Sequence, residues 1–171
     1  MAIEELLRTL AANREVFKGL LEDVSPALQS WRPRTGSWNL LEILCHLIDE
    51  EQEDFRARTR LALLNGSEDL VSINPVGWVL DRDYGSRDYA TELIRFVKER
   101  DISVNWLRSL KNPHWSASFY HDALGKMTAS KMLANWLAHD YLHIRQITAI
   151  KYDYLREFSG EDLSYAGNWR P

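Results

Sequence analysis

The feature that most constrains the fold is a long helical pattern of apolar residues between residues 128 and 151. One face of this segment repeats at alternating spacings of three and four residues, which places its side chains on a single stripe of an α-helix. Because most of the stripe is apolar, it must face a core. We predict a helix capped by Thr128 or Ser130 that ends near Lys151. The stripe consists of Met132, Trp136, His139, His143, Ile147 and Ile150.

Three other segments carry the same periodicity and predict three more helices. The first covers residues 3–22. The second, capped by Ser37, runs to about Leu64 and has an inward stripe that begins at Ile43. A third helix begins at Ser86. Its predicted buried side chains are Leu93, Ile94, Val97, Ile102, Trp106, Leu107 and Leu110.

Two long links and a tail separate or follow these helices. Residues 65–85 and 111–127 contain Asn-Pro pairs and glycines, and we expect no long regular element in the first and no strand in the second. Residues 152–171 are expected to be an irregular tail. The sequence therefore predicts a single all-α domain over residues 1–171, a four-helix bundle with long crossover links.

Composition narrows the function classes. The chain has 171 residues, 45% hydrophobic and 27% charged, which is typical of a soluble globular domain. A net charge of −4 argues against nucleic acid as a partner, because phosphate binding needs a basic face. Cys45 is the single cysteine, so no internal disulfide forms, and the first residues contain no long apolar run. We expect a cytoplasmic protein that binds no membrane.

The candidate chemistry lies in three histidines. His139 and His143 are one helical turn apart on the buried stripe, so both imidazoles can reach one ion. His46 lies on the inward stripe of the second helix, followed by Glu50 and then Ala57. Glu50 can accept a hydrogen bond from a ligand imidazole or approach the metal itself. Three protein ligands leave a coordination position open, as in a reactive site.

Each of these features also has a structural interpretation. A histidine on an apolar face is often a hydrogen-bonded core residue, and neutral imidazole suits zinc, nickel, copper or iron equally well. The segment 139–143 differs from the zinc-protease motif H-E-x-x-H, because Asp140 replaces the general-base glutamate. Asp140 therefore supports a neighbour or is solvated. We expect Cys45 to be a buried thiol, His114 and His121 to be exposed or to cap a turn, and the charged run 49–54, apart from Glu50, to face solvent.

Two blocks of the chain resemble a known family. Residues 37–47, SWNLLEILCHL, are similar to the S-W-x-x-x-E-x-x-x-H-L opening of the DinB-like (damage-inducible) superfamily. Residues 121–147 resemble its later signature, a glycine-containing loop followed by a helix with H-D-x-x-H-x-x-Q-I. The blocks occur in the expected order, and the resemblance covers nearly the whole chain.

The resemblance implies a four-helix bundle in which His46, His139 and His143 bind a divalent metal ion, with zinc or nickel expected. Characterised branches of the superfamily include S-transferases that use bacillithiol, mycothiol or glutathione, and a mycothiol-dependent maleylpyruvate isomerase. Family members are often homodimers, so the resemblance also implies a homodimer.

Three functional hypotheses follow. The first is a metal-dependent thiol S-transferase that joins a low-molecular-weight thiol to a small electrophile, since a coordinated thiol is readily deprotonated. The second is a non-catalytic, metal-binding stress-response protein or a metal-stabilised dimeric scaffold. The third is a metal-free helical scaffold with core histidines.

Overall fold

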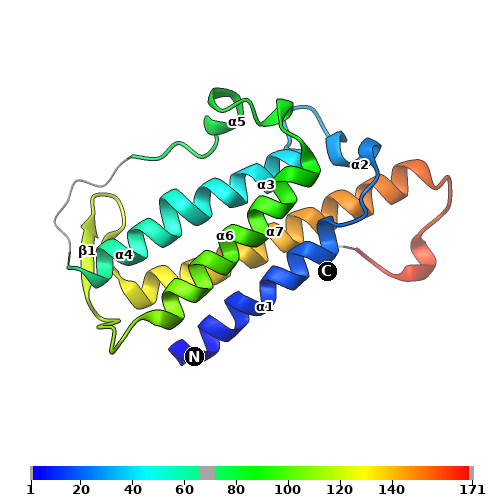
Figure 1. The fold of residues 1–171 in the computed structure, drawn as a ribbon. Helices are drawn as coiled ribbons and strands as arrows, with labels where there is room; N and C mark the ends of the chain where they lie inside the picture. The colour runs from blue at the N-terminus through cyan, green and yellow to red at the C-terminus, as the bar shows by residue number, and fades with distance from the viewer. Residues whose placement is uncertain (1, 66–71, 170–171) are drawn as a thin grey trace.

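The computed structural model describes residues 2–65 and 72–169, and it confirms the predicted four-helix bundle (Figure 1). The second long helix is continuous over three segments, with a π-helical stretch, η1, between α3 and α4. The long helices are α1 (Ile3–Leu21), α3–η1–α4 (Leu40–Asp49, Glu50–Arg56 and Ala57–Leu63), α6 (Tyr89–Ser109) and α7 (Ala129–Phe158). Shorter helices are α2 (Pro26–Ser30), α5 (Trp78–Asp81), η2 (Tyr84–Ser86) and η3 (Ser164–Ala166).

The bundle is not an up-down-up-down chain of hairpins. Helices α1 and α7 run in the same direction, and the α3–η1–α4 helix and α6 both run the opposite way (Figure 1). The connection from α4 to α6 therefore returns along the length of the bundle and carries α5 and η2. Residues 66–71 of the link predicted at 65–85 lie outside the described residues. A crossover of this kind was expected from the length of the link.

The start of α3 differs from the prediction. Asn39, not Ser37, is the N-cap: its side chain accepts a hydrogen bond from the backbone N–H of Glu42 at 2.9 Å. The Glu42 carboxylate accepts one from the backbone N–H of Asn39 at 3.0 Å, which completes a capping box. Ser37 instead donates its hydroxyl hydrogen to the carbonyl of Arg34 in the preceding turn. This box fixes the helix that carries His46.

The third helix also begins later than predicted. Asp88 is its N-cap, while Ser86 belongs to the short helix η2. Two residues assigned to its buried side are on the outside: Ile94 is 70% exposed and Ile102 is 42% exposed. The inner face is occupied at one position by Arg100, which is fully buried. The prediction of these buried positions was wrong because it followed apolar residues only, and the inward stripe of α6 contains a charged residue.

The link before α7 contains a β-hairpin that the sequence analysis did not predict. Strand β1 (Ser118–His121) pairs antiparallel with β2 (Gly125–Thr128). Phe119 lies opposite Met127, and both side chains are buried against the bundle. Each strand has four residues, which is too short for a clear alternating pattern. The hairpin packs on α4 and the start of α7.

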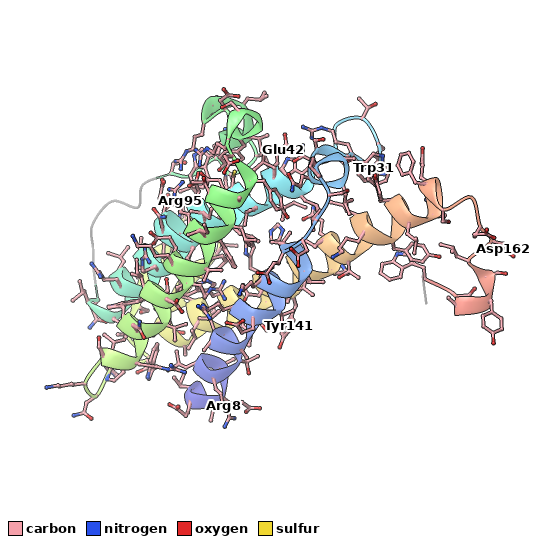
Figure 2. All side chains as sticks on the ribbon, turned by 45° about the vertical axis from the view of Figure 1, so that its right-hand side comes forward. Arg8, Trp31, Glu42, Arg95, Tyr141 and Asp162 are labelled. Atoms are coloured by element: carbon pink, nitrogen blue, oxygen red, sulfur yellow. The ribbon has the colours of Figure 1, made fainter. Side chains whose placement is uncertain are left out.

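The C-terminal helix is longer than predicted. It continues to Phe158, so the first residues of the expected irregular tail are helical. An aromatic cluster stabilises this extension: the ring centroid of Trp31 lies 5.4 Å from that of Tyr154 and 6.2 Å from that of Phe158. Figure 2 shows Trp31 beside this part of α7, where the helix reaches beyond the other long helices. Among the described residues, no helix is both long enough and apolar enough to cross a membrane.

Candidate metal centre

The three predicted ligands come from two neighbouring helices of the bundle, α3 and α7. His46 lies in α3, and His139 and His143 lie one turn apart in α7. His46 is 5% exposed and His143 is 8% exposed, whereas His139 is half-buried. The sequence therefore placed all three histidines correctly on inward faces, and His139 is the one nearest to solvent.

The three imidazoles meet at their Nε2 atoms. Nε2 of His139 lies 3.3 Å from Nε2 of His46 and 3.1 Å from Nε2 of His143. One ligand nitrogen from each of the three rings lies within 4.8 Å of the other two. Two nitrogens that bind one zinc ion at about 2.0–2.1 Å with tetrahedral angles lie roughly 3.3–3.4 Å apart. The spacing of the Nε2 atoms therefore fits a shared cation.

Hydrogen bonding alone does not satisfy this arrangement. A neutral imidazole nitrogen either carries one hydrogen or offers one lone pair. Nε2 of His139 has two Nε2 neighbours, so one hydrogen bond leaves the other contact without a proper partner. A cation accepts all three lone pairs at once. This set of donors is consequently a better fit to a metal ion than to a hydrogen-bonded core.

The electrostatic setting keeps the histidines neutral. Burial lowers the pKa of His46 to about 3 and that of His139 to about 2, and neighbouring imidazoles add to both shifts. Burial also lowers the pKa of His143 to about 4, against the opposing influence of Gln146 and Asp140. Neutral imidazole is the form that binds metals. The site therefore presents deprotonated ligands throughout the physiological pH range.

A pocket of about 370 Å³ lies beside His139. Its wall is formed by η1, α4, the β-hairpin and α7, and it is mostly apolar, with a few polar side chains. His139 joins this pocket to the buried Nε2 cluster. The lining residues are Asp54, Phe55, Arg58, Ile73, Phe119, His121, Leu124, Met127, Met132, Asn135, Ala138, His139 and Leu142.

Comparison with known proteins gives the family. A family model described as the DinB superfamily matches residues 9–147, well over half of the chain. The chain belongs to the DinB superfamily. The family that its motifs resembled is thus confirmed.

Among solved structures, this DinB protein is similar to YfiT from Bacillus subtilis, which is described as "a probable metal-dependent hydrolase with an unusual four-helix bundle topology". The two chains are 19% identical, with a TM-score of 0.76 over 94% of this chain and 91% of the other. At this identity the similarity establishes the shared fold. A search of curated proteins returned no match.

Aromatic packing, more than hydrogen bonding, orients the ligand rings of this DinB protein. The Trp38 ring lies 4.8 Å from that of His46, and the Phe55 ring lies 4.9 Å from that of His139, measured between centroids. Nδ1 of His46 and Nδ1 of His143 are buried, and no hydrogen-bond partner for either is found among the described residues. Packing against the neighbouring aromatic side chains therefore orients the rings, and their Nε2 atoms point toward one another.

Glu50 is buried, as expected for a residue near the site, and it is 5% exposed. Its side chain bonds with the Asp54 carboxyl, and no hydrogen bond from an imidazole to Glu50 is found in the described part of the chain. Its predicted role beside the metal stays a prediction. The inward stripe predicted to continue to Ala57 is wrong: Ala57 is exposed and Phe55 and Thr59 are buried.

The π-helical stretch η1 explains this change of face. In a π-turn the hydrogen bonds join residues five apart, so the stripe shifts by about one residue relative to an α-helix. Glu50 and Phe55 consequently share the inner face, and Phe55 reaches His139. π-turns within α-helices are frequent at functional sites.

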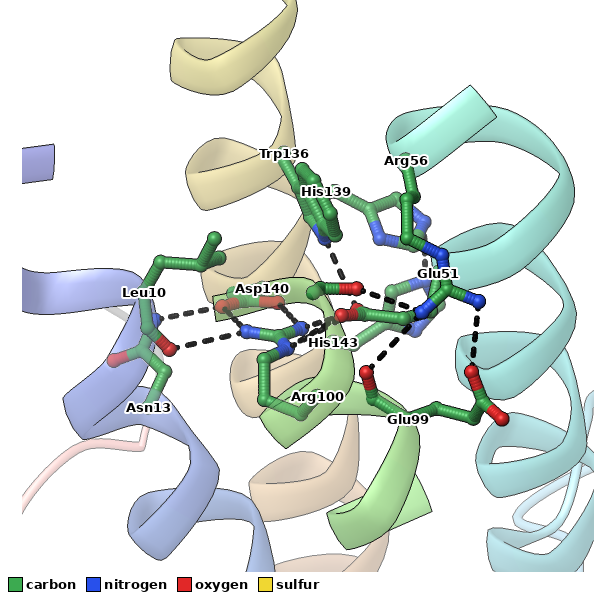
Figure 3. A network of polar contacts seen from close by, with 11 residues as sticks. Leu10, Asn13, Glu51, Arg56, Glu99, Arg100, Trp136, His139, Asp140 and His143 are labelled. Carbon is green, nitrogen blue, oxygen red and sulfur yellow. Dashed lines mark hydrogen bonds and ion pairs between the residues drawn. The ribbon is translucent and has the colours of Figure 1, made fainter. Parts of the chain in front are cut away.

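Next to the histidines lies a buried ion network formed by Glu51, Arg100 and Asp140 (Figure 3). Arg100 donates to both Asp140 carboxylate oxygens at 2.7 and 2.8 Å and to both Glu51 oxygens at 3.0 and 3.1 Å. It also donates to the carbonyl of Leu10, while Trp136 Nε1 donates to Glu51. The network ties α1, η1, α6 and α7 together around the site.

Sequence reasoning missed most of this network. Glu51 was assigned to a solvated face, as was Asp49, and both are buried. Asp49 accepts hydrogen bonds from Tyr84 at 2.7 Å and from Arg82 at 2.8 Å. For Asp140 the supporting role is correct, because it pairs with Arg100. One signal was available: Phe96, Arg100 and Leu107 share a helical stripe with an arginine between two apolar residues.

The other histidines and the cysteine agree with expectation. Cys45 is a fully buried thiol, and burial raises its pKa to about 12. His114 is exposed. Nδ1 of His121 accepts hydrogen bonds from the backbone N–H groups of Ala123 and Leu124, which caps the hairpin turn. Neither His114 nor His121 joins the metal centre, although His121 lines the pocket.

Proposed function

We propose that this protein is a metal-dependent enzyme that binds a divalent ion through Nε2 of His46, His139 and His143 and acts on small electrophiles. One observation carries the proposal: three neutral imidazoles from two helices converge, and the most exposed of them borders an apolar pocket. A bound divalent ion would lower the pKa of a water or thiol in its open position. The chain itself supplies the ligands, the water-excluding wall and the polar groups of the pocket.

A small thiol is the nucleophile that the family relationship favours, which makes the protein a thiol S-transferase. The pocket is consistent with this chemistry, because side chains such as Phe119, Met127 and Leu142 suit an apolar electrophile. Water is the alternative nucleophile, and the description of YfiT favours it. The two reactions use the same metal site and the same pocket, and they differ in the molecule that fills the open position.

A non-catalytic metal-binding protein is the competing proposal, together with a metal-stabilised homodimer. A sealed structural site is fully coordinated by protein. Here three ligands leave a position for a further molecule, and His139 is half-buried beside the pocket rather than enclosed. This observation favours the catalytic proposal.

Metal content provides the first test. The purified protein, the His143→Ala variant and the His114→Ala control should be dialysed against a metal-free buffer, then loaded with zinc or nickel and measured by elemental analysis. We expect about one ion per chain in wild type and control, and at least a tenfold loss in His143→Ala. A ligand present at a hundred times its dissociation constant raises the free energy of unfolding by about 2.7 kcal/mol. This gain should disappear in the same variant. Equal, low metal content in all three proteins would refute the proposal.

Turnover provides the second test. Metal-loaded protein should be assayed with a panel of small thiols and a chromogenic aryl electrophile, and separately with phenyl esters in the absence of thiol. Thiol-dependent conjugation that is lost in His143→Ala supports the S-transferase. Ester cleavage without thiol supports the hydrolase. Metal binding without either activity would support the non-catalytic protein.

A further inference from the structure

Two carboxyl side chains lie one turn apart in η1, where the pocket approaches the histidines. Asp54 lines the pocket together with Phe55 and His139. Glu50 lies behind Asp54, with 5% of its surface exposed, and the two side chains hydrogen-bond to each other. Glu50 was predicted to lie beside the metal ligands, whereas Asp54 was not predicted to take part in the site. The cluster of possible ligands among the described residues contains the three histidines and neither carboxyl, so the pair lies beside that cluster.

The chemistry of this contact requires a proton. Ionised carboxylates only accept hydrogen bonds, so two of them bond only when one carries a hydrogen. Oε1 of Glu50 is buried and accepts no hydrogen bond from an N–H or O–H group of the described residues. Arg58 forms an ion pair with Asp54. Asp54 is thus the ionised member, and Glu50 holds the proton.

The surrounding charges support this assignment. Burial raises the pKa of Glu50 to about 8, the charges of Asp54 and Asp49 add to the rise, and Arg58 opposes it. Burial also raises the pKa of Asp54, against the influence of Arg58 and His121. Beyond their own helix, the pair faces His121 of the hairpin and the half-buried His139 of α7 across the pocket. Near neutral pH the pair consequently stores one proton at the pocket wall.

We propose that Glu50 and Asp54 are a proton-storing pair that donates its proton, through Asp54, to the leaving oxygen of a substrate bound in the pocket. This inference rests on the proposed function and specifies its substrate class: a mostly apolar molecule, such as an aryl or alkyl ester, whose leaving group is a poor one. The nucleophile, a water or thiol that has already lost its proton to solvent, forms a bond to the carbonyl carbon, the C–O bond breaks, and its electron pair stays on the leaving oxygen. The Glu50 proton moves to the ionised Asp54, and Asp54 passes it to the leaving oxygen.

After the transfer both carboxylates are ionised, with Arg58 beside Asp54, and solvent returns the proton to the pair. Asp54 is the member positioned for contact with the substrate, because it lines the pocket. Glu50 acts through Asp54 as its proton reservoir. This reservoir role accounts for a buried acidic residue on an inward face for which no salt bridge to an arginine or lysine is found among the described residues.

The stored proton is measurable without any activity. Carboxyl carbon-13 signals of glutamate and aspartate should be followed by NMR from about pH 4 to pH 10 in metal-free and zinc-loaded protein. We expect one glutamate signal to titrate near pH 8 and to vanish in Glu50→Gln, and Asp54→Asn to move its midpoint down by more than one pH unit. Glu53→Gln is the matched control, because Glu53 lies in the same stretch but is exposed and bonds with Arg82. A Glu50 signal that titrates below about pH 5 would overturn the shared proton.

The donor role is measured with two esters of the same acid, each assayed with and without a small thiol, because the proposed nucleophile is a thiol or water. Phenyl acetate releases phenolate, a poor leaving group that is helped by a proton donor. p-Nitrophenyl acetate releases p-nitrophenolate, which is stable enough to leave without one. A proton donor contributes about 10²–10⁴-fold to a rate. We expect Asp54→Asn to slow cleavage of the phenyl ester at least 100-fold and that of the p-nitrophenyl ester less than tenfold, with unchanged zinc content. Glu50→Gln should shift the pH profile with the phenyl ester.

The outcomes separate the two proposals. Equal losses with both esters would assign Asp54 a purely structural role and overturn the donor role. A loss of zinc in Asp54→Asn or Glu50→Gln would make the pair part of the metal centre and overturn it as well. Wild-type protein that binds no metal would refute the proposed function, while the NMR titration would still decide whether the proton is stored. Metal-loaded wild type that cleaves neither ester would overturn the assigned substrate class.

Discussion

The bundle buries two polar clusters next to each other, the ion network of Glu51, Arg100 and Asp140 and the histidine site of His46, His139 and His143. Both involve the α3–η1–α4 helix and α7, and both remove polar side chains from water. In the network, Arg100 is surrounded by acceptors on two carboxylates and a backbone carbonyl. In the histidine site, two Nδ1 atoms have no described partner and three Nε2 atoms face one another.

The ion network stabilises the fold through its own contacts. The histidines, in contrast, are positioned by the packing around them. A buried charge is tolerated when all of its hydrogen-bonding and charge partners are present. Removing one partner leaves a buried charge without compensation, which carries a large desolvation cost. Imidazoles with incomplete partners contribute little to folding, and their lone pairs remain available to a ligand. Stability and binding should therefore respond to different substitutions, although the two clusters touch at the consecutive residues His139 and Asp140 of α7.

The largest expected effect on stability comes from removing the Arg100 side chain, the positive charge of the ion network. Arg100→Met leaves Glu51 and Asp140 buried without a positive partner, so the free energy of unfolding should fall by about 3–5 kcal/mol. Urea unfolding of the metal-free protein, followed by circular dichroism, measures this. Arg156→Met is the control: the Arg156 side chain is exposed, and the loss of its salt bridge to Asp153 should cost about 1 kcal/mol or less.

A triple variant keeps this test valid if Arg100→Met does not fold. Glu51→Met, Arg100→Met and Asp140→Leu together remove every charge of the network at similar volume. Such replacements are often neutral or stabilising, so the triple variant should regain most of the lost stability. Equal, small losses in Arg100→Met and Arg156→Met would contradict the view that this network holds the helices together.

The pH dependence of stability should identify the histidine site. In the unfolded chain each histidine takes up a proton near pH 6.5. In the folded, metal-free protein burial lowers the pKa of His46 to about 3, that of His139 to about 2 and that of His143 to about 4. The unfolded state therefore binds more protons below about pH 6.5, and the free energy of unfolding should fall as pH decreases from there towards pH 4.

Each such histidine contributes a slope of up to about 1.4 kcal/mol per pH unit. His143→Leu should remove about one proton from this slope between roughly pH 4 and pH 6. The exposed control His114→Leu should leave the slope unchanged. Unfolding curves at four or five pH values, with a chelator present, are sufficient. An unchanged slope in His143→Leu would mean that this imidazole is protonated in the folded protein.

Local periodicity explains how much of this the sequence could predict. The α7 stripe requires only neighbours along one helix, so His139 and His143 were placed correctly on its inner face. His46 was placed on the inner face of the second helix by the same kind of pattern, and the paired motifs of the DinB resemblance joined it to the two histidines of α7. No local pattern indicates which two stripes meet, and the distances between the Nε2 atoms could only come from the structure.

The wrong predictions concern features that depend on contacts between segments far apart in the sequence or on a local change of helix type. Arg100 has partners on η1 and α7, 49 and 40 positions away in the chain, so its burial depends on tertiary contacts. Glu51 was assigned to solvent as part of the charged run 49–54, and the π-turn η1, which begins one residue before it, changes the register of this stretch. The residues that line the pocket could not be named from the sequence because the hairpin that forms part of its wall consists of two four-residue strands.

The smallest expected effect is also the one that separates a metal site from a core of hydrogen-bonded histidines. Replacing a buried polar group with an apolar group of similar size costs little when no buried partner is left unsatisfied. In His143→Leu, Nε2 of His139 still has Nε2 of His46 as a hydrogen-bond partner. His143→Leu should therefore change the free energy of unfolding of the metal-free protein at pH 7.5 by no more than about 1 kcal/mol. Leu133→Ala, a fully buried position on the same helix, should cost about 2–5 kcal/mol in the same experiment. If His143→Leu costs as much as Leu133→Ala, the imidazoles are structural partners of one another, and the contrast between the two clusters disappears. If His143→Leu costs little and also removes the stabilisation by zinc, the packing of the bundle holds His143 in place and its role is to bind the ion.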